Sequence, residues 1–175
     1  MRKKKFITVA IDSPAAAGAG TQSKLIAKHY KLFYLDTGKI YRHIGLLRIK
    51  YKTKLTYKII RKDILKLNTK LLTNKKLLAD EVAISASIVA RDKKVRDIVH
   101  KFQQQCAYDP PKKFNGSVLD GRDITSIQVK DAMFKFFITA SIITRAKRRF
   151  EEYRKLKKNI SLNEVIKSIR KRDKL

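Results

Sequence analysis

Apolar and polar positions divide the first thirty residues into three segments. Residues 6–11 form a short apolar run rich in β-branched side chains, which predicts a buried strand. Small residues and one proline follow over residues 13–20. Residues 21–30 then predict an amphipathic helix, with apolar side chains at helical spacing at Leu25, Ile26 and Tyr30. A strand, a small-residue loop and a helix form the context of a phosphate-binding loop, because backbone N–H groups and the helix dipole point at the anion.

The same alternation continues along the rest of the chain. Short apolar runs predict strands at residues 32–35, 117–119 and 134–138. Helical periodicity predicts helices over residues 39–51, 81–91 and 162–173, from Asp92 through Phe102 and from Ser141 onward, with one or two short helices between 52 and 80. Asp92 could cap the helix that follows it, and Ser161 and Glu164 form a capping box before the last helix. Strands that alternate with helices predict an α/β fold with a parallel sheet and helices on both faces.

The small-residue loop departs from the usual phosphate-loop pattern. That pattern is a glycine, four residues and then Gly-Lys followed by Ser or Thr. Here Ser13 stands at the first glycine position, Gly18 at the second, and Ala19 where the lysine belongs, with Gly20 and Thr21 next. From the loop alone two interpretations stay open: a phosphate-binding loop, or a tight strand-to-helix turn built from small residues.

Composition narrows the class of protein. The 175 residues suit one domain, and a hydrophobic fraction of 43% is too high for a disordered chain. No apolar run approaches the roughly 18–20 residues of a membrane span, and the basic start of the chain has no signal-peptide apolar region. The single cysteine, Cys106, excludes an internal disulfide framework and a cysteine-based zinc site. A cytoplasmic protein with no membrane partner fits these features.

The net charge of +28 would ordinarily suggest a nucleic-acid partner. The positive residues are nevertheless spread along the whole chain, and the abundance of lysine and isoleucine is what A/T-rich codon usage would produce. Solvated basic faces are therefore favoured over dedicated nucleic-acid binding, although non-specific adhesion to RNA at low salt is compatible with this charge. We expect a monomer.

Three separated blocks carry a family resemblance. The segments IDSPAAAGAGT, FYLDTGKIYR and VLDGRD resemble the bacterial cytidylate kinase family, whose loop reads IDGPAGAGKGT, and they occur in the family's order. The similarity continues to the last residue and is weak between residues 47 and 78. The resemblance implies a P-loop nucleoside-monophosphate kinase that transfers the γ-phosphate of ATP to CMP or dCMP with Mg²⁺.

The resemblance also implies an organisation of the domain. The whole chain, 1–175, would be a single kinase domain with a core over residues 1–38 and 117–140. The acceptor-binding part would cover about 39–108 and a lid about 141–160. Because the family continues past Arg172 and Asp173 with a last strand and helix, we expect this chain to lack the end of the domain.

Site residues follow from the same resemblance. The ATP-binding residues would be Ser13, Pro14, Ala15, Ala16, Ala17, Gly18, Ala19, Gly20 and Thr21. The acceptor-binding residues would be Thr37, Arg42, Ser87, Arg96, Arg122 and Asp123. Asp120 and the lid residues Arg145 and Arg149 would be catalytic, with Mg²⁺ bound together with ATP and no metal ligand directly assigned.

Each of these residues also has a purely structural interpretation. Thr37 could cap a helix and Arg42 could be a solvated side chain. Ser87 and Arg96 could be ordinary surface residues. An arginine between two aspartates could form a structural ion pair, although strand-end residues of α/β sheets usually line ligand crevices. The lid arginines could belong to a solvated basic face.

Ala19 raises the question of which cation meets the β- and γ-phosphates. We expect Lys24 to be a poor substitute, because it lies more than a helical turn beyond the loop and its side chain should point elsewhere. The lid arginines, Arg145 and Arg149, are the expected substitutes.

Three other functions stay open. The first is a kinase for another nucleotide, since GTQ after the loop also resembles adenylate kinases. The other two are a degenerate protein that binds nucleotide without turnover and a basic RNA-associated protein.

Overall fold

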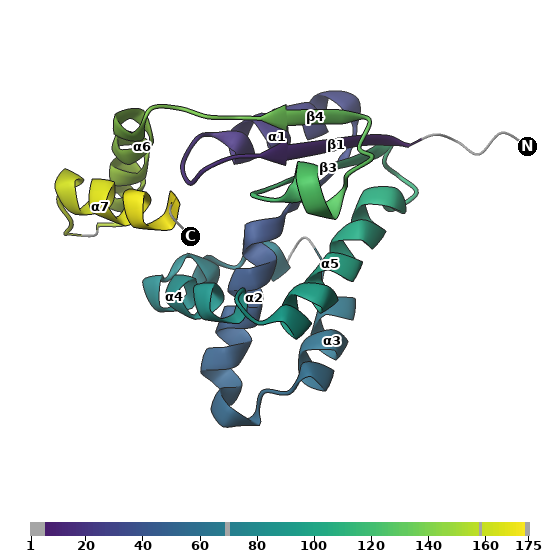
Figure 1. Ribbon diagram of the computed structural model, residues 1–175, viewed down its shortest axis with the longest axis horizontal. Helices are drawn as coiled ribbons and strands as arrows, with labels where there is room; N and C mark the ends of the chain where they lie inside the picture. Colours follow the sequence, from purple (N-terminus) through teal and green to yellow (C-terminus); the bar gives the residue numbers. More distant parts are fainter. Residues whose placement is uncertain (1–5, 69–70, 158, 174–175) are drawn as a thin grey trace, which may run out of the picture.

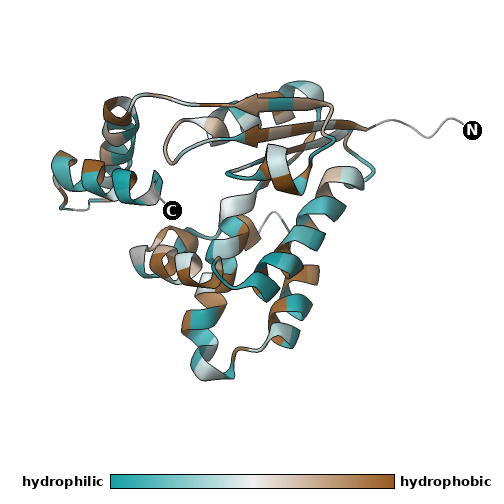
Figure 2. Cartoon of the chain, in the orientation of Figure 1, coloured by the Kyte–Doolittle hydropathy of each residue, from teal (hydrophilic) through white to brown (hydrophobic). Residues whose placement is uncertain are grey.

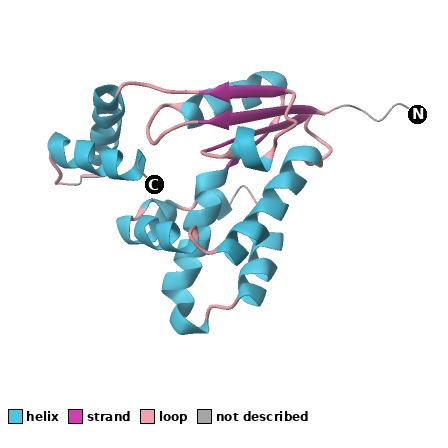
Figure 3. Cartoon of the chain, in the orientation of Figure 1, coloured by secondary structure: helices cyan, strands magenta, loops and turns pink. Residues whose placement is uncertain are grey.

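The computed structural model describes residues 6–68, 71–157 and 159–173. Four strands form one sheet in these residues: β1 (Ile7–Asp12), β2 (Phe33–Asp36), β3 (Gly116–Gly121) and β4 (Phe134–Phe137). Their order is β2-β3-β1-β4, and each neighbouring pair is parallel (Figure 3). Consecutive strands are therefore joined by crossover segments that contain helices, and the predicted parallel α/β sheet is confirmed.

Helices cover both faces of the sheet. Val9 and Ile11 of β1 pack in one apolar cluster with α1 (Ala19–Tyr30), whereas Ala10 faces a second cluster. This second cluster is the larger core, and it joins the sheet to α2 (Thr37–Tyr51), α3 (Tyr57–Leu65) and α5 (Lys93–Tyr108). Alternate residues of one buried strand thus serve two apolar layers, as the period of two in a strand requires.

The buried face of α1 differs from the predicted one. Leu25 and Tyr30 are 57% and 54% exposed, and the face toward the sheet consists of Ala19, Ser23 and Ala27. Small residues spaced by four let the helix axis approach the strands closely, so the larger apolar residues are turned toward solvent. The helix also begins at Ala19, two residues earlier than the pattern predicted.

The helices below the sheet in Figure 1 form a second layer built around α2 and α4 (Asp80–Val89). The Ser85 hydroxyl donates a hydrogen bond to the Gly45 carbonyl at 3.0 Å. Asp92 caps α5 as predicted, because its carboxylate accepts hydrogen bonds from the backbone N–H groups of Lys94 and Val95. Short 3₁₀ turns connect these helices at Lys52–Lys54, Leu71–Thr73 and Lys75–Leu78.

Two further helices, α6 (Ile142–Lys155) and α7 (Leu162–Asp173), pack on each other to one side of the sheet (Figure 1). The Ser141 hydroxyl caps α6 by accepting from Thr144 N–H, and Ser161 and Glu164 form the predicted reciprocal capping box before α7. Figure 2 shows hydrophilic residues over much of both helices and hydrophobic residues along β1 and β4. The edge strand β4 exposes the side chains of Phe134, Phe136 and Phe137.

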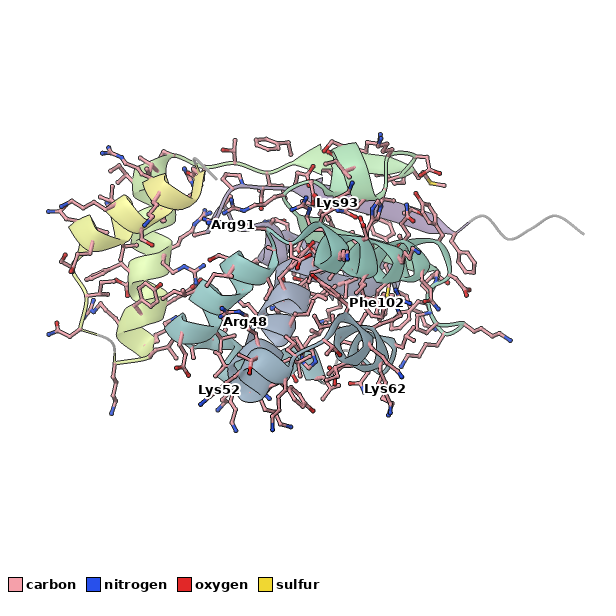
Figure 4. All side chains as sticks on the ribbon, turned by 60° about the horizontal axis from the view of Figure 1, so that its bottom comes forward. Arg48, Lys52, Lys62, Arg91, Lys93 and Phe102 are labelled. Carbon is pink, nitrogen blue, oxygen red and sulfur yellow. The ribbon has the colours of Figure 1, made fainter. Side chains whose placement is uncertain are left out.

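Basic side chains project from many elements. In Figure 4, Arg48 and Lys52 project from the far end of α2, Lys62 from α3, and Arg91 and Lys93 from the α4–α5 junction. All five are exposed. This arrangement agrees with positive charge distributed over solvated faces. Within the described ranges, no helix combines the length and the apolar character that crossing a bilayer requires.

Close contact between α2 and α4 makes Gly45 a sensitive position. A Cβ added there would lie 2.7 Å from the Ala86 nitrogen and 2.9 Å from the Val82 oxygen, both backbone atoms. We expect Gly45→Ala to lower the free energy of unfolding by about 1–3 kcal/mol, because the helices must move apart. Gly38→Ala on the same helix, whose added Cβ meets only Asp36 Oδ1 at 3.4 Å, is the matched control. Equal urea midpoints for the two variants would contradict this expectation.

Candidate active site

The small-residue loop leaves β1 and turns into α1 with two left-handed residues. Ala16 has φ 60° and Gly18 has φ 101°. Ser13 N–H donates to the Gly121 carbonyl at 3.0 Å, which ties the start of the loop to β3. Among the described residues, no protein acceptor is bonded to the backbone N–H groups of Ala15, Ala16 and Gly18. Such N–H groups around left-handed residues at a helix N-terminus form a concave site that suits an anion.

A cavity of about 390 Å³ lies over this loop. Its lining combines all of residues 13–21 with groups from four other parts of the chain: Lys24, Asp36, Gly38, Asp120, Gly121, Arg122, Arg149 and Glu152. Every residue predicted to bind ATP lines it, together with two of the three residues predicted to be catalytic, Asp120 and Arg149. Arg122 is the one predicted acceptor residue in this lining.

Parallel pairing brings two carboxylates to this cavity. Asp120 is opposite Ile11 in the β1–β3 register and opposite Asp36 in the β2–β3 register. Burial, and then the nearby charge of Asp36, raise the pKa of Asp120 to about 7, while a 3.2 Å hydrogen bond from the Tyr34 hydroxyl opposes this shift. Burial, followed by the charge of Asp120, raises the pKa of Tyr34. A carboxyl group next to the loop is thus poised to exchange a proton near neutral pH.

Asp12 braces the segment that follows β3. Its buried carboxylate accepts hydrogen bonds from Ile124 N–H at 2.6 Å, from Thr125 N–H at 3.0 Å and from the Thr125 hydroxyl at 2.5 Å. These bonds fix the π-helical turn Ile124–Gln128 against the end of β1. Sequence reasoning did not single out Asp12, although a polar residue at the end of an apolar strand next to the loop was a usable signal.

Thr37 and Arg42 lie on the first turns of α2. The Thr37 hydroxyl is buried and donates to the Asp120 carbonyl at 2.7 Å. The helix cap is Asp36, which accepts from Lys39 N–H at 3.2 Å, so the interpretation of Thr37 as the cap is wrong. Arg42 is half-buried, and its Nη1 donates to the Leu77 carbonyl at 2.8 Å. Arg42 therefore links α2 to the segment before α4.

The other predicted acceptor residues occupy two separate places. Ser87 is exposed, and its hydroxyl donates to the Ile84 carbonyl one turn earlier. Arg96 is exposed and donates to two carbonyls at the end of α4, and Asp123 accepts from the Gln128 amide at 3.0 Å. Burial, then the charge of Asp123, raise the pKa of Tyr41 to about 12, and Arg96 opposes them. The charges of both Arg96 and Asp123 thus act on Tyr41, which the sequence patterns did not indicate.

Helix α6, which begins the segment predicted to be a lid, is bonded to loop 13–21. Arg145 Nη1 donates to the Ala15 carbonyl at 3.3 Å and forms a 2.7 Å ion pair with Asp173. With Arg145 only 7% exposed, the interpretation of this residue as part of a solvated face is wrong. Arg148 Nη1 donates to the Ala17 carbonyl at 2.7 Å. The helical pattern placed Arg148 beside the predicted pair but gave no reason to select it.

The expectation that Lys24 points away from the loop is wrong. Lys24 lines the cavity, and its charge lowers the pKa of Asp120 as a minor opposing influence. The physical reason is that side chains on a helix lean toward its N-terminus, so a residue four positions after Gly20 covers the turn that contains Gly20.

The pKa of Asp120 predicts how stability depends on pH. An unfolded aspartate ionises near pH 4, whereas folded Asp120 does so near pH 7. The folded state therefore holds a proton that the unfolded state releases, and the free energy of unfolding should fall as pH rises through this window. We expect Asp120→Asn to remove this decline and to be more stable than the natural sequence at pH 8, by on the order of 2–4 kcal/mol.

Urea unfolding from pH 4 to pH 8 measures this effect. Asp97→Asn, an exposed aspartate on α5, is the control and should follow the natural sequence. A pH slope that is the same with and without the Asp120 carboxylate would refute the expectation.

Known proteins resemble the chain over almost its whole length. A family model for cytidylate kinase matches residues 9–175. The cytidylate kinase of Rhodospirillum rubrum is 35% identical over 170 residues, which cover 94% of this chain and 78% of the relative. That of Clostridium botulinum (strain Loch Maree / Type A3) is 36% identical over 95% of this chain and 80% of the relative. That of Bacillus pumilus is 34% identical over 98% and 81%.

These matches include the three blocks on which the resemblance was based. They extend through the loop, the strand-end carboxylates and the lid helix, the parts that the structure brings together around one cavity. The fold agrees with them, since the sheet is parallel and helices cover both of its faces. The chain therefore belongs to the cytidylate kinase family.

Proposed function

We propose that this protein transfers the γ-phosphate of ATP to CMP or dCMP and releases ADP with CDP or dCDP. The observation that carries the proposal is one cavity lined jointly by loop 13–21, by Asp36 and Asp120 at the strand ends and by Arg149 of the lid. Phosphoryl transfer needs little covalent chemistry from a protein and depends on positioning and charge neutralisation. A cavity that joins anion-binding N–H groups, paired carboxylates and a lid cation meets those needs.

In this proposal, loop 13–21 binds the phosphates of ATP. The unbonded N–H groups of Ala15, Ala16 and Gly18 and the N-terminus of α1 would face the negative oxygens. Arg145 and Arg148 of α6 bond to the carbonyls of Ala15 and Ala17 in the same loop. These bonds would help to fix the orientation of the loop's peptide groups.

Mg²⁺ bound with ATP fits the oxygen groups of the cavity. The charge of Asp36 disfavours ionisation of Asp120, and a cation near both carboxylates would relieve this repulsion. No cluster of three or more His, Cys, Asp or Glu side chains occurs in the part of the chain that the structure describes. Mg²⁺ commonly uses only one or two protein carboxylates with phosphate and water oxygens, so Asp120 and the Thr21 hydroxyl would hold it. The ion would neutralise charge on the transferring phosphates.

The acceptor would bind on the α2 side of the cavity. The Thr37 hydroxyl is bonded to the backbone carbonyl of Asp120, and the charges of Arg96 and Asp123 both act on Tyr41. These side chains would present polar groups to a nucleotide. The full acceptor set remains the one expected from the family: Thr37, Arg42, Ser87, Arg96, Arg122 and Asp123. The proposal keeps the division of the chain into a core, an acceptor-binding part and a lid. We further propose that the protein works as a monomer in the cytoplasm.

A second candidate function is nucleotide binding without turnover, and Ala19 is the observation that favours it. Removing one electrostatic contact to the transition state commonly costs on the order of 10²–10³ in rate. A protein that lacks the loop lysine could keep the backbone anion site and lose the chemistry.

A coupled assay of ADP release with a panel of monophosphates tests both candidates. Turnover with CMP or dCMP supports the kinase, and turnover mainly with another monophosphate would point to a different nucleotide kinase. ATP binding without any turnover would support the binding-only protein. RNA affinity that stays high at physiological ionic strength, with no ATP binding, would favour an RNA-associated protein.

Acceptor choice gives the first kinetic prediction. We expect CMP and dCMP to be better acceptors than AMP or GMP. Asp123→Ala should raise KM for CMP about tenfold or more, because a hydrogen bond to a charged group is lost, with little change in KM for ATP. Asp97→Ala is the control for a general loss of negative charge. Equal turnover of AMP and CMP, or equal effects on both KM values, would contradict the acceptor assignment.

The lid gives the second kinetic prediction. Arg149 lines the cavity and is held by Glu152 at 2.7 Å. We expect Arg149→Ala to lower kcat by on the order of 10²–10³ with little loss of ATP affinity, because the lost charge acts mainly on the transition state. Arg154→Ala, an exposed arginine of the same helix paired with Glu151, should leave kcat unchanged. An unchanged kcat in Arg149→Ala would exclude the lid assignment.

A further inference from the structure

The face of α1 that carries Gly20 offers a cation to the loop from an unexpected direction. Gly20 and Lys24 are four residues apart, so they lie on the same face of the helix. The side chain of Lys24 leans toward the helix N-terminus and passes over a residue that has no side chain of its own. Lys24 is therefore the next residue after loop 13–21 that lines the cavity.

Asp120 lies across from Lys24. Asp120 Oδ2 is 3.4 Å from the position that a Cβ on Gly20 would occupy, and the charge of Lys24 acts on the pKa of Asp120. No carboxylate oxygen of the described residues lies within 4.0 Å of the Lys24 ammonium group. The ammonium group is thus near the strand-end carboxylate without being committed to an ion pair.

The lid arginines, by contrast, have protein partners in this arrangement. Arg145 is held by Asp173 and by the Ala15 carbonyl. Arg148 is bonded to the Ala17 carbonyl, and Arg149 is paired with Glu152. These bonds hold the three guanidinium groups in place and leave part of their charge neutralised in Arg145 and Arg149, whereas the ammonium group of exposed Lys24 has no ion pair with a described carboxylate to offset its charge.

We propose that Lys24 supplies the positive charge that the lysine at position 19 would supply to the β- and γ-phosphates of ATP. This inference rests on the proposed function only in taking loop 13–21 as the phosphate site. A lysine suits the position because its ammonium group is a compact charge on a flexible stem of four carbons. The charge reaches the phosphates from the second turn of α1 and not from the loop itself.

Calorimetric binding of ATP, and separately of inorganic tripolyphosphate, tests the inference. Lys24→Met keeps most of the length of the side chain and removes its charge, so both affinities should fall by about 10- to 100-fold. Lys24→Arg keeps the charge and should retain most of the binding. Lys28→Met removes an equal charge one turn further along α1, outside the cavity lining, and should bind like the natural sequence. Adding Ala19→Lys to Lys24→Met should restore affinity. Circular dichroism checks that each variant is folded.

The outcomes separate this inference from the proposed function. Lys24-dependent binding of tripolyphosphate in a protein that phosphorylates no monophosphate would sustain the inference and overturn the kinase proposal. If the natural protein phosphorylates CMP and Lys24→Met binds ATP and tripolyphosphate as well as the natural sequence does, the kinase proposal stands and the inference is overturned. If Lys24→Met binds both ligands like the natural sequence while Ala19→Lys restores kcat in Arg149→Ala, the substitute charge belongs to the lid and the inference is overturned. Failure of the natural sequence to bind either ligand would overturn both.

Discussion

The parallel pairing of β1 with β3 is the constraint on which the site depends. It places the start of the phosphate loop and the carboxylate of Asp120 at the same edge of the sheet, and the Ser13–Gly121 hydrogen bond extends the pairing into the loop. The buried carboxylate of Asp12 completes this arrangement by accepting three hydrogen bonds from Ile124 and Thr125. A buried charge is costly unless its lone pairs are satisfied, so these donors hold the segment after β3 in one position.

Helices α6 and α7, which include the proposed lid, contact loop 13–21 through both polar and apolar groups. Three consecutive loop residues contact the lid side: Ala15 and Ala17 through their carbonyls, and Ala16 through its methyl group, which packs against the apolar cluster of α6 and α7. Ala16 has a left-handed conformation that costs a residue with a Cβ on the order of 1 kcal/mol, and the family's loop has glycine there. Burial of the Ala16 methyl group against α6 and α7 offsets part of this cost.

The sequence predicted the elements of the fold better than the directions of side chains. The apolar run of β1, the cap at Asp92 and the capping box at Ser161 depend on a few neighbouring residues, and each was recognised. The buried face of α1 was predicted wrongly because the prediction relied on the spacing of large apolar side chains. Close packing of this helix on the sheet instead buries its alanine and serine residues. The family resemblance implied that Asp120 and Arg149 belong to the same site, and both residues line one cavity. The contacts of Tyr41 and Arg148 depend on residues far apart in the chain, and no local pattern carries that information.

The charge of the whole chain cannot replace a contact cation in the loop. A net charge of +28 attracts ATP from a distance, but salt screens exposed charges over about 8 Å at physiological ionic strength. Attraction of this kind also acts equally on the bound substrate and on the transition state, so it raises occupancy without lowering the barrier. Charge that develops on the phosphates is stabilised only by groups held in place inside the cavity, away from bulk water. Among the described residues, the basic side chains that line this cavity are those of Lys24, Arg122 and Arg149.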